Sequence, residues 1–290
     1  MKKFKFFYQA FFLAVLSICA IACPGKSDAA GMAQNDFRYG AEGLKQDTFS
    51  LMFPASRNLI LGAEASVYKT NEYEKVHSAK IPVSYAGRTN LASFKPFIYS
   101  HHLGMTAFGG QISLSTIFSL QNETKDSIML SITGSHAIIK GEKTSGDIEK
   151  FSQTAFEMKA EAEVQSNFKF IAGGAGYLSP SKNMKAEGLS KSVFDMKNLA
   201  DINAYQIIRE LPEWAANVKF IRNFQPDFNN SFYAGYSKIS FRNSHDANSY
   251  IAGMEFFVSE ETTWDIGYNY FKYHDKSASQ YFRIFVSTVF

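Results

Sequence analysis

Apolar and polar residues alternate with a period of two along most of the chain. Between 107 and 120 the even positions include Phe108, Ile112 and Leu114, whereas the odd positions include Gln111 and Ser113. Successive side chains of a strand point to opposite faces, so this spacing predicts one apolar and one polar face. Segments of about ten such residues, separated by turn residues, are typical of a membrane-spanning β-barrel.

Segment 153–164 shows the alternation most sharply. Its even positions from 156 are apolar, and its odd positions carry Glu157, Lys159, Glu161 and Glu163. The Ala, Glu, Lys and Met content favours a helix by propensity, but a helix would spread the four charges around its circumference. We therefore predict a strand here.

The alternating segments from 59 to 290 predict twelve strands. Two shorter candidates, 37–42 and 49–53, raise the number to fourteen, which we favour because their apolar faces have no better place to be buried. The expected fold is all-β, a transmembrane antiparallel up-and-down barrel of 14 strands, with 12 as the alternative. Pro82 and Pro96 fall inside predicted strands and lack a ladder donor, so we expect bulges or register shifts there.

Short and long connections alternate between the strands. The short ones are expected to face the periplasm and the long ones the outside, the longest at 179–212. Within that loop, apolar residues recur at roughly helical spacing between 192 and 210. A short amphipathic helix there could narrow the barrel mouth, lie on the rim or contact a partner, and a plain loop is the alternative.

Residues 1–29 have the layout of a cleaved signal peptide. Lys2, Lys3 and Lys5 precede an apolar run over 6–22, and Ser27-Asp28-Ala29 fits a small-x-small cleavage site. An uncleaved anchor is the alternative, and the stretch ending in Cys23 is similar to a lipobox in which that cysteine is lipidated. The expected organisation is a signal peptide at 1–29 and one barrel domain at 30–290, with the long loop at 179–212.

The net positive charge of the chain comes from this leader. Residues 1–29 hold four lysines and one aspartate, so the totals of 30 basic and 27 acidic residues become 26 and 26 in the remainder. A neutral mature chain gives no reason to expect a nucleic-acid partner. Both cysteines, Cys19 and Cys23, lie in the leader, so cleavage near Ala29 removes disulfides, thiolate metal sites and a cysteine nucleophile.

The last ten residues carry a family resemblance. Apolar residues alternate before a final aromatic residue at Phe282, Ile284, Val286 and Phe290, and Thr288 departs from the pattern. This segment resembles the C-terminal strand of Gram-negative outer-membrane β-barrel proteins, porin-like in architecture. The resemblance implies that the barrel-assembly machinery recognises this strand. It also implies export through the inner membrane and residence in the outer membrane, among its lipid and lipopolysaccharide.

The predicted inner face carries both signs of charge and is the candidate pore lining. It comprises Glu64, Lys80, Lys95, Glu157, Lys159, Glu161, Glu163, Lys169, Lys219, Lys238, Glu255, Asp265 and Arg283. We expect a channel for passive diffusion or transport of small solutes, with weak ion preference and a size cut-off set by 179–212. The alternatives are a structural or surface-interaction barrel without an open pore, in which Glu163 and Lys169 only stabilise the wall, and a lipid-acting hydrolase.

Enzyme chemistry has weaker support. Three serines directly precede histidines, at Ser100-His101, Ser135-His136 and Ser244-His245, but adjacent strand residues point to opposite faces and cannot meet within one strand. His101-His102 has no nearby third ligand for a metal. We expect no catalytic residues, no metal and no cofactor.

Overall fold

The computed structural model describes residues 31–69, 76–101, 106–120, 126–142, 148–178, 212–225, 230–241, 246–274 and 278–290. The predicted signal peptide, Cys23 and the connection at 179–211 lie outside these residues. The described part is dominated by strands, with one 3-10 helix, η1 (Ala41–Gly43). In this part of the chain, no helix is long and apolar enough to cross a membrane.

The strands run antiparallel, each hydrogen-bonded to its neighbours in the sheet. Their bounds are β1 (Met32–Gly40), β2 (Lys45–Pro54), β3 (Leu59–Lys69), β4 (Val76–Lys80), β5 (Val83–Ala86), β6 (Asn90–His101), β7 (Thr106–Ser119), β8 (Ser127–Glu142), β9 (Ile148–Val164), β10 (Phe168–Leu178), β11 (Pro212–Gln225), β12 (Asn230–Phe241), β13 (Ala247–Phe257), β14 (Thr262–Tyr273) and β15 (Ala278–Val289).

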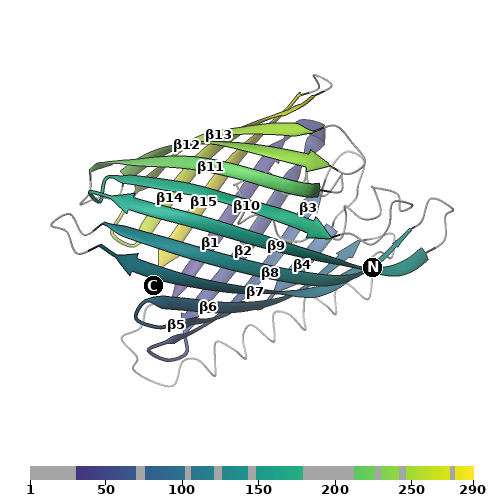
Figure 1. The fold of residues 1–290 in the computed structure, drawn as a ribbon, viewed down its shortest axis with the longest axis horizontal. Coiled ribbons are helices and arrows are strands. Elements are labelled where there is room, and N and C mark those ends of the chain that lie inside the picture. Colours follow the sequence, from purple (N-terminus) through teal and green to yellow (C-terminus); the bar gives the residue numbers. More distant parts are fainter. Residues whose placement is uncertain are drawn as a thin grey trace.

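The sheet closes on itself. β1 pairs with β15 as well as with β2, and β2 pairs with β3, so the described strands have no free edge in the ring. Backbone hydrogen bonds between Gly31 and Phe290, of 2.8 and 2.9 Å, extend the β1–β15 seam. Figure 1 shows the tilted strands around the barrel, with β7 to β11 in front and β1, β2, β14 and β15 behind.

The described strands form a barrel of fourteen, because β4 and β5 are two parts of one strand that pairs with β3 on one side and β6 on the other. The prediction of fourteen strands is confirmed and the alternative of twelve is wrong. The two short N-terminal candidates form β1 and β2, which are longer than the sequence pattern indicated.

Pro82 interrupts this strand without shifting its register. Lys80 lies opposite Glu64 on β3, and Val83 lies opposite Leu61, so three steps on one strand match three on the other. The Pro82 carbonyl still accepts the Gly62 N–H at 2.8 Å. The structure therefore has a break where we predicted a bulge, because proline removes one donor and inserts no residue.

Pro96 lies within an unbroken β6, and its carbonyl accepts the Ile81 N–H at 3.2 Å. The expected register shift is absent from this described strand. Shifts occur instead at the two ends of β11, between Pro212 and Trp214 and between Asn223 and Gln225.

Segment 153–164 belongs to strand β9, as its alternation predicted. β9 pairs with β8 from Ile148 to Glu163 and with β10 from Thr154 to Val164. These long ladders satisfy the backbone on both sides, and this tertiary pairing outweighs the helix propensity of the composition.

Large apolar side chains stand exposed on the outer face of the barrel. Phe108 is 64% exposed and Leu114 is 59% exposed, and Ile132, Phe156 and Met158 on the following strands are also exposed. In the ladders Leu114 lies opposite Ile132, which lies opposite Met158, so the exposed residues form continuous rows. An apolar band of this kind is the surface that a barrel presents to lipid.

Candidate functional site: the polar inner wall

The other face of each strand carries most of the polar side chains and forms the inner wall. Thr48 hydrogen-bonds Ser66 at 2.9 Å, and Ser113 is 3.0 Å from Thr133. Ser131 donates to Ser115 at 2.8 Å. These pairs join neighbouring strands directly, so the hydroxyl groups find partners within the wall.

The structure places all but one of the thirteen candidate pore-lining residues on this inner face. The inner-face group comprises Glu64, Lys80, Lys95, Glu157, Lys159, Glu161, Glu163, Lys169, Lys219, Glu255, Asp265 and Arg283. Position on this face is what the alternation predicted. Their role in lining a water-filled path stays a prediction.

Lys238 is the exception and lies on the outer face. Its neighbours along β12, Ser237 and Ile239, are buried on the inner side, and its amino group is 5.7 Å from the centre of the Trp214 ring. The assignment was wrong because the inner positions of β12 include apolar residues, which weakens the alternation. A lysine can keep its stem against apolar surface while the amino group reaches the polar edge of the membrane.

A network of ion pairs joins β1, β15 and β14. Arg38 binds Asp36 through both carboxylate oxygens, at 3.3 and 3.1 Å. Arg283 donates to Asp36 at 3.2 Å and to Asp265 at 2.7 Å. Arg38 and Arg283 are directly opposite each other in the ladder, and Asp36 between them offsets the repulsion of these like charges.

Tyr233 extends this network to β12. Its hydroxyl donates to Asp265 at 2.7 Å, although a whole strand, β13, separates β12 from β14. The ring crosses two facing glycines: a side chain at Gly253 would collide with it, and a Cβ at Gly267 would lie 2.6 Å from its hydroxyl. These glycines therefore provide the space in which Tyr233 reaches Asp265. The Lys219 amino group lies 4.1 Å from the centre of the same ring.

Other ion pairs occur around the wall. Lys80 binds Glu64 at 2.8 Å, and Lys159 pairs with Glu161 on β9. Lys169 and Glu163 lie 3.6 Å apart across the β9–β10 turn, as the wall-stabilising alternative predicted. When β4 and β5 are counted as one, β9 lies seven strands from β1 in both directions. The acidic residues of β9 are therefore across the barrel from Arg38.

The charges assigned here to the inner face balance. Seven are basic and seven are acidic: Arg38, Lys80, Lys95, Lys159, Lys169, Lys219 and Arg283 against Asp36, Glu64, Glu157, Glu161, Glu163, Glu255 and Asp265. The described part of the wall therefore carries no net charge, and such a surface attracts neither anions nor cations strongly.

Sequence reasoning missed Asp36, Tyr233 and Asn269, and it did not include Arg38 in the pore lining. Asp36 and Arg38 lie on β1, which the sequence indicated only as a short candidate starting at Phe37. A period-two count extended back to Met32 would have placed Asp36 and Arg38 on one face. Tyr233 carries no such signal, because only the ladder shows that two glycines lie between it and Asp265.

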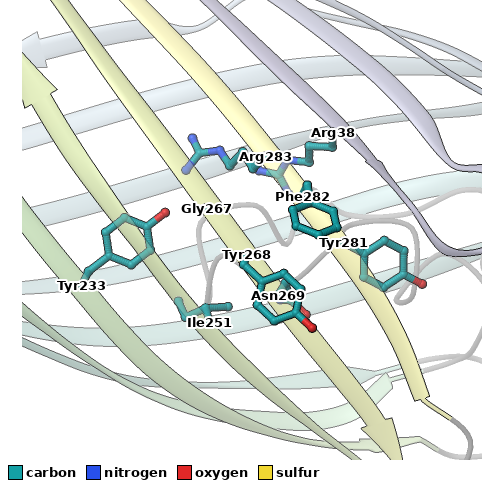
Figure 2. Close-up of a pocket in the computed structure, with 9 residues that line it drawn as sticks. All are labelled: Arg38, Tyr233, Ile251, Gly267, Tyr268, Asn269, Tyr281, Phe282 and Arg283. Carbon is teal, nitrogen blue, oxygen red and sulfur yellow. The ribbon is translucent and has the colours of Figure 1, made fainter.

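A small cavity lies beside this network. Its volume is about 30 Å³, and its lining includes Arg38, Arg283, Asn269, Tyr233, Tyr281 and Ile251. Figure 2 shows the side chains of Arg38 and Arg283 close together at one end, with Tyr233 and Tyr281 on opposite sides of the site.

Ser135-His136 is the Ser-His pair whose two side chains both belong to the described part of the chain, and these side chains point to opposite faces of β8. His136 points outward and is 2.9 Å from Thr154 Oγ1, whereas Ser135 lies on the inner face. Among the described residues no group of three or more His, Cys, Asp or Glu side chains could hold a metal ion. His102 and His245 lie outside those residues.

The four residues of the C-terminal pattern lie at the β1–β15 seam. Phe282 stacks on Tyr39 of β1 with ring centres 5.2 Å apart, and Phe290 makes an edge contact with Phe53 at 6.1 Å. Ile284 and Val286 lie opposite Phe37 and Asn35. In the folded barrel Phe282 and Phe290 are 40% and 62% exposed on the outer face, and recognition by the assembly machinery stays a prediction.

Comparison with known proteins shows similarity in fold. No family model matches the chain, and no curated protein matches it significantly. Pseudomonas putida OprB is 7% identical with a TM-score of 0.50, covering 91% of this chain and 94% of that one. The monoaromatic hydrocarbon channel CymD is 10% identical with a TM-score of 0.50, covering 92% and 89%. A bacterial polysaccharide outer membrane secretin is 8% identical with a TM-score of 0.50, covering 91% and 100%.

The closed fourteen-strand barrel, its apolar outer band and its polar inner wall define a class. The chain is a closed antiparallel β-barrel that is apolar outside and polar inside, and its fold is similar to that of outer-membrane β-barrels of known structure. At the identities of these structural neighbours the likeness concerns the fold alone.

Proposed function

We propose that this protein is an outer-membrane channel for the passive diffusion of small solutes. The observation that carries the proposal is the inner wall, which is polar, charged in both signs and balanced in net charge. A membrane protein that needed only a stable wall could fill its interior with apolar side chains. Hydroxyl ladders and ion pairs facing inward instead provide a surface that water and polar solutes can contact.

The strand number supports the same proposal. In barrels of about eight strands, the wall side chains alone can fill the interior, and the enclosed space grows with strand number. Fourteen strands therefore enclose a wider interior than eight strands do. CymD, a neighbour of equal TM-score to OprB, is a monoaromatic hydrocarbon channel, which is consistent with a channel on this fold.

The proposal includes the location and the partners expected from the sequence. The apolar band would contact outer-membrane lipid and lipopolysaccharide, and the barrel-assembly machinery would recognise the C-terminal strand β15. Export by a cleaved signal peptide would precede assembly. These parts rest on the sequence pattern together with the apolar outer band.

A structural barrel without an open path is the second candidate. It is favoured by the depth of burial on the inner wall, where Asp36, Lys80 and Gln111 are each less than a tenth exposed. Close packing of inner side chains could leave no continuous aqueous route. The hydrolase hypothesis has no such observation in its favour among the described residues, since Ser135 and His136 lie on opposite faces.

Single-channel recording separates the first two candidates. The refolded mature chain in a planar bilayer should show steady conductance, and under a potassium chloride gradient the reversal potential should stay close to zero because the wall charges cancel. A variant lacking 182–210 should conduct more if that segment narrows the mouth. Silence from both forms would favour the structural barrel, and strong anion or cation selectivity would contradict the charge balance.

A further inference from the structure

The cavity at the Arg38–Asp36–Arg283 network has the size of a small polar group. A cavity of about 10–15 Å³ holds one water, so about 30 Å³ accommodates about two waters or hydroxyl groups. Its lining combines polar groups from β1, β14 and β15 with the rings of Tyr233 and Tyr281. Few polar groups on an otherwise apolar lining are the usual composition of a small-molecule subsite.

Asn269 supplies an acceptor that is not used within the wall. Its side chain is 8% exposed, its Nδ2 donates to Ser249 Oγ at 2.9 Å, and its Oδ1 has no hydrogen-bond partner among the described residues. A buried acceptor without a partner is unfavourable, because the group has lost its hydrogen bond to water. The cavity that Asn269 lines therefore favours an occupant with a hydrogen-bond donor.

Arg38 supplies the matching donor. Its Nε and Nη2 are engaged by Asp36, and no hydrogen bond is recorded from its Nη1 to the described residues. Arg283 is 19% exposed, so this end of the network stays accessible, while its Nε and Nη1 hold Asp36 and Asp265. The occupant should accept from a guanidinium and donate to Asn269.

The charge balance decides which chemistry fits. The two guanidinium charges are matched by two carboxylates, so an added anion would face as much repulsion from Asp36 and Asp265 as attraction from the arginines. A hydroxyl group donates and accepts without carrying charge. We propose that this cavity is a wall subsite for the hydroxyl groups of a neutral, hydroxyl-rich solute of the sugar or sugar-alcohol class, which deepens the channel proposal and relies on it for access.

A ligand-observed NMR titration of the refolded barrel in detergent tests this directly. The probes are glucitol, which is neutral, and gluconate, a similar chain that carries a carboxylate. Wild type should bind glucitol saturably and no more weakly than gluconate. Asn269→Leu should weaken glucitol binding about tenfold, the scale of one lost neutral hydrogen bond, whereas Asn269→Asp, which keeps an acceptor, should retain it.

Asn217 provides the matched control. It is also buried on the inner face, on β11, and its Oδ1 has no hydrogen-bond partner within the described strands, but it does not line this cavity. Asn217→Leu should leave glucitol binding unchanged. Equal binding by wild type and Asn269→Leu, a preference for gluconate, or no saturable binding at all, as for a cavity that holds only water, would each overturn the subsite.

Failure of this inference is distinguishable from failure of the channel. The same preparations are recorded in a planar bilayer. A barrel that is silent yet binds glucitol through Asn269 would retain the subsite and remove the channel. A barrel that conducts but does not bind glucitol would retain the channel and remove the subsite.

Discussion

Arg283 on β15 binds two carboxylates that lie on the two strands flanking β15. Asp36 on β1 and Asp265 on β14 are nearly fully buried, and each accepts a hydrogen bond from the guanidinium between them. Without this cation Asp265 would retain the Tyr233 hydroxyl and Asp36 would retain Arg38. Arg283 therefore connects β15 to both of its neighbours in the sheet, β1 and β14.

Replacing Arg283 by methionine should destabilise the barrel by about 3 kcal/mol, because removing one partner leaves buried carboxylates with less compensation. Urea unfolding of the refolded protein in lipid vesicles, followed by tryptophan fluorescence, measures the difference. Lys169→Met is the matched control: its pair with Glu163 is 39% and 44% exposed, so its loss should cost less than about 1 kcal/mol. Equal losses from both variants would show that the Arg283 network adds no special stability.

Residue-level placement was predictable where a strand alternates cleanly. The odd positions of 157–163 are all on the inner face, as the sequence indicated. Lys238 was misplaced because Tyr233, Ile239 and Phe241 put apolar groups inside on the same strand. Pairings such as Arg283 with Asp36, separated by 247 residues, could not be derived from one sequence, since they depend on which strands close the ring.

At the scale of single elements, the turn between β9 and β10 contains the non-glycine residues with positive φ in the described part of the chain. Gln165 and Ser166 both have φ near 55°, a region that costs non-glycine residues energy. Neighbouring turns hold it: Gln165 N–H donates to Asp126 at 2.7 Å, and Asn223 donates to the Ser166 carbonyl at 2.9 Å. The conformation is therefore imposed by contacts from β7–β8 and β11.

Ser166→Gly should stabilise the barrel by about 0.5–1 kcal/mol, since glycine adopts this φ without the Cβ clash, and its added backbone entropy offsets only part of that gain. Arg57→Gly in the β2–β3 turn is the control, because that turn has no positive-φ residue. There glycine only increases the freedom of the unfolded chain and should destabilise slightly. The same vesicle unfolding assay compares them, and a loss of stability in Ser166→Gly would contradict the strain argument.

The strands themselves were largely predictable, because each spans one period-two run between turn residues. β7 (106–119) lies within one residue of the alternating segment 107–120, and β9 (148–164) contains segment 153–164. The effect of Pro82 could not be predicted from the sequence, because a residue without a backbone N–H donor can produce either a bulge or a break in the strand. The outcome there depends on Glu64 and Leu61 across the ladder, which hold the register on both sides.

At the scale of the whole molecule, closure of the barrel explains why charged side chains of both signs lie on the inner wall. Closure gives every strand two neighbours and leaves an apolar band outside, so polar groups that cannot face lipid face inward. With seven charges of each sign assigned to that wall, most can be paired locally, as at Glu64–Lys80 and Asp265–Arg283. The sequence indicated the two faces and both signs, but only the ring order shows that acidic β9 lies across from β1.

The central claim is that the inner wall encloses water through which solutes pass, and thiol accessibility during current recording tests it most directly. Leu114 and Ser115 are adjacent on β7, with Leu114 outward and Ser115 bonded to Ser131 on the inner wall. In the mature chain lacking both leader cysteines, a membrane-impermeant thiol reagent should reduce the conductance of Ser115→Cys and leave Leu114→Cys unchanged. Modification of Leu114→Cys alone, or of neither in a folded barrel, would contradict a water-filled lumen bounded by this wall.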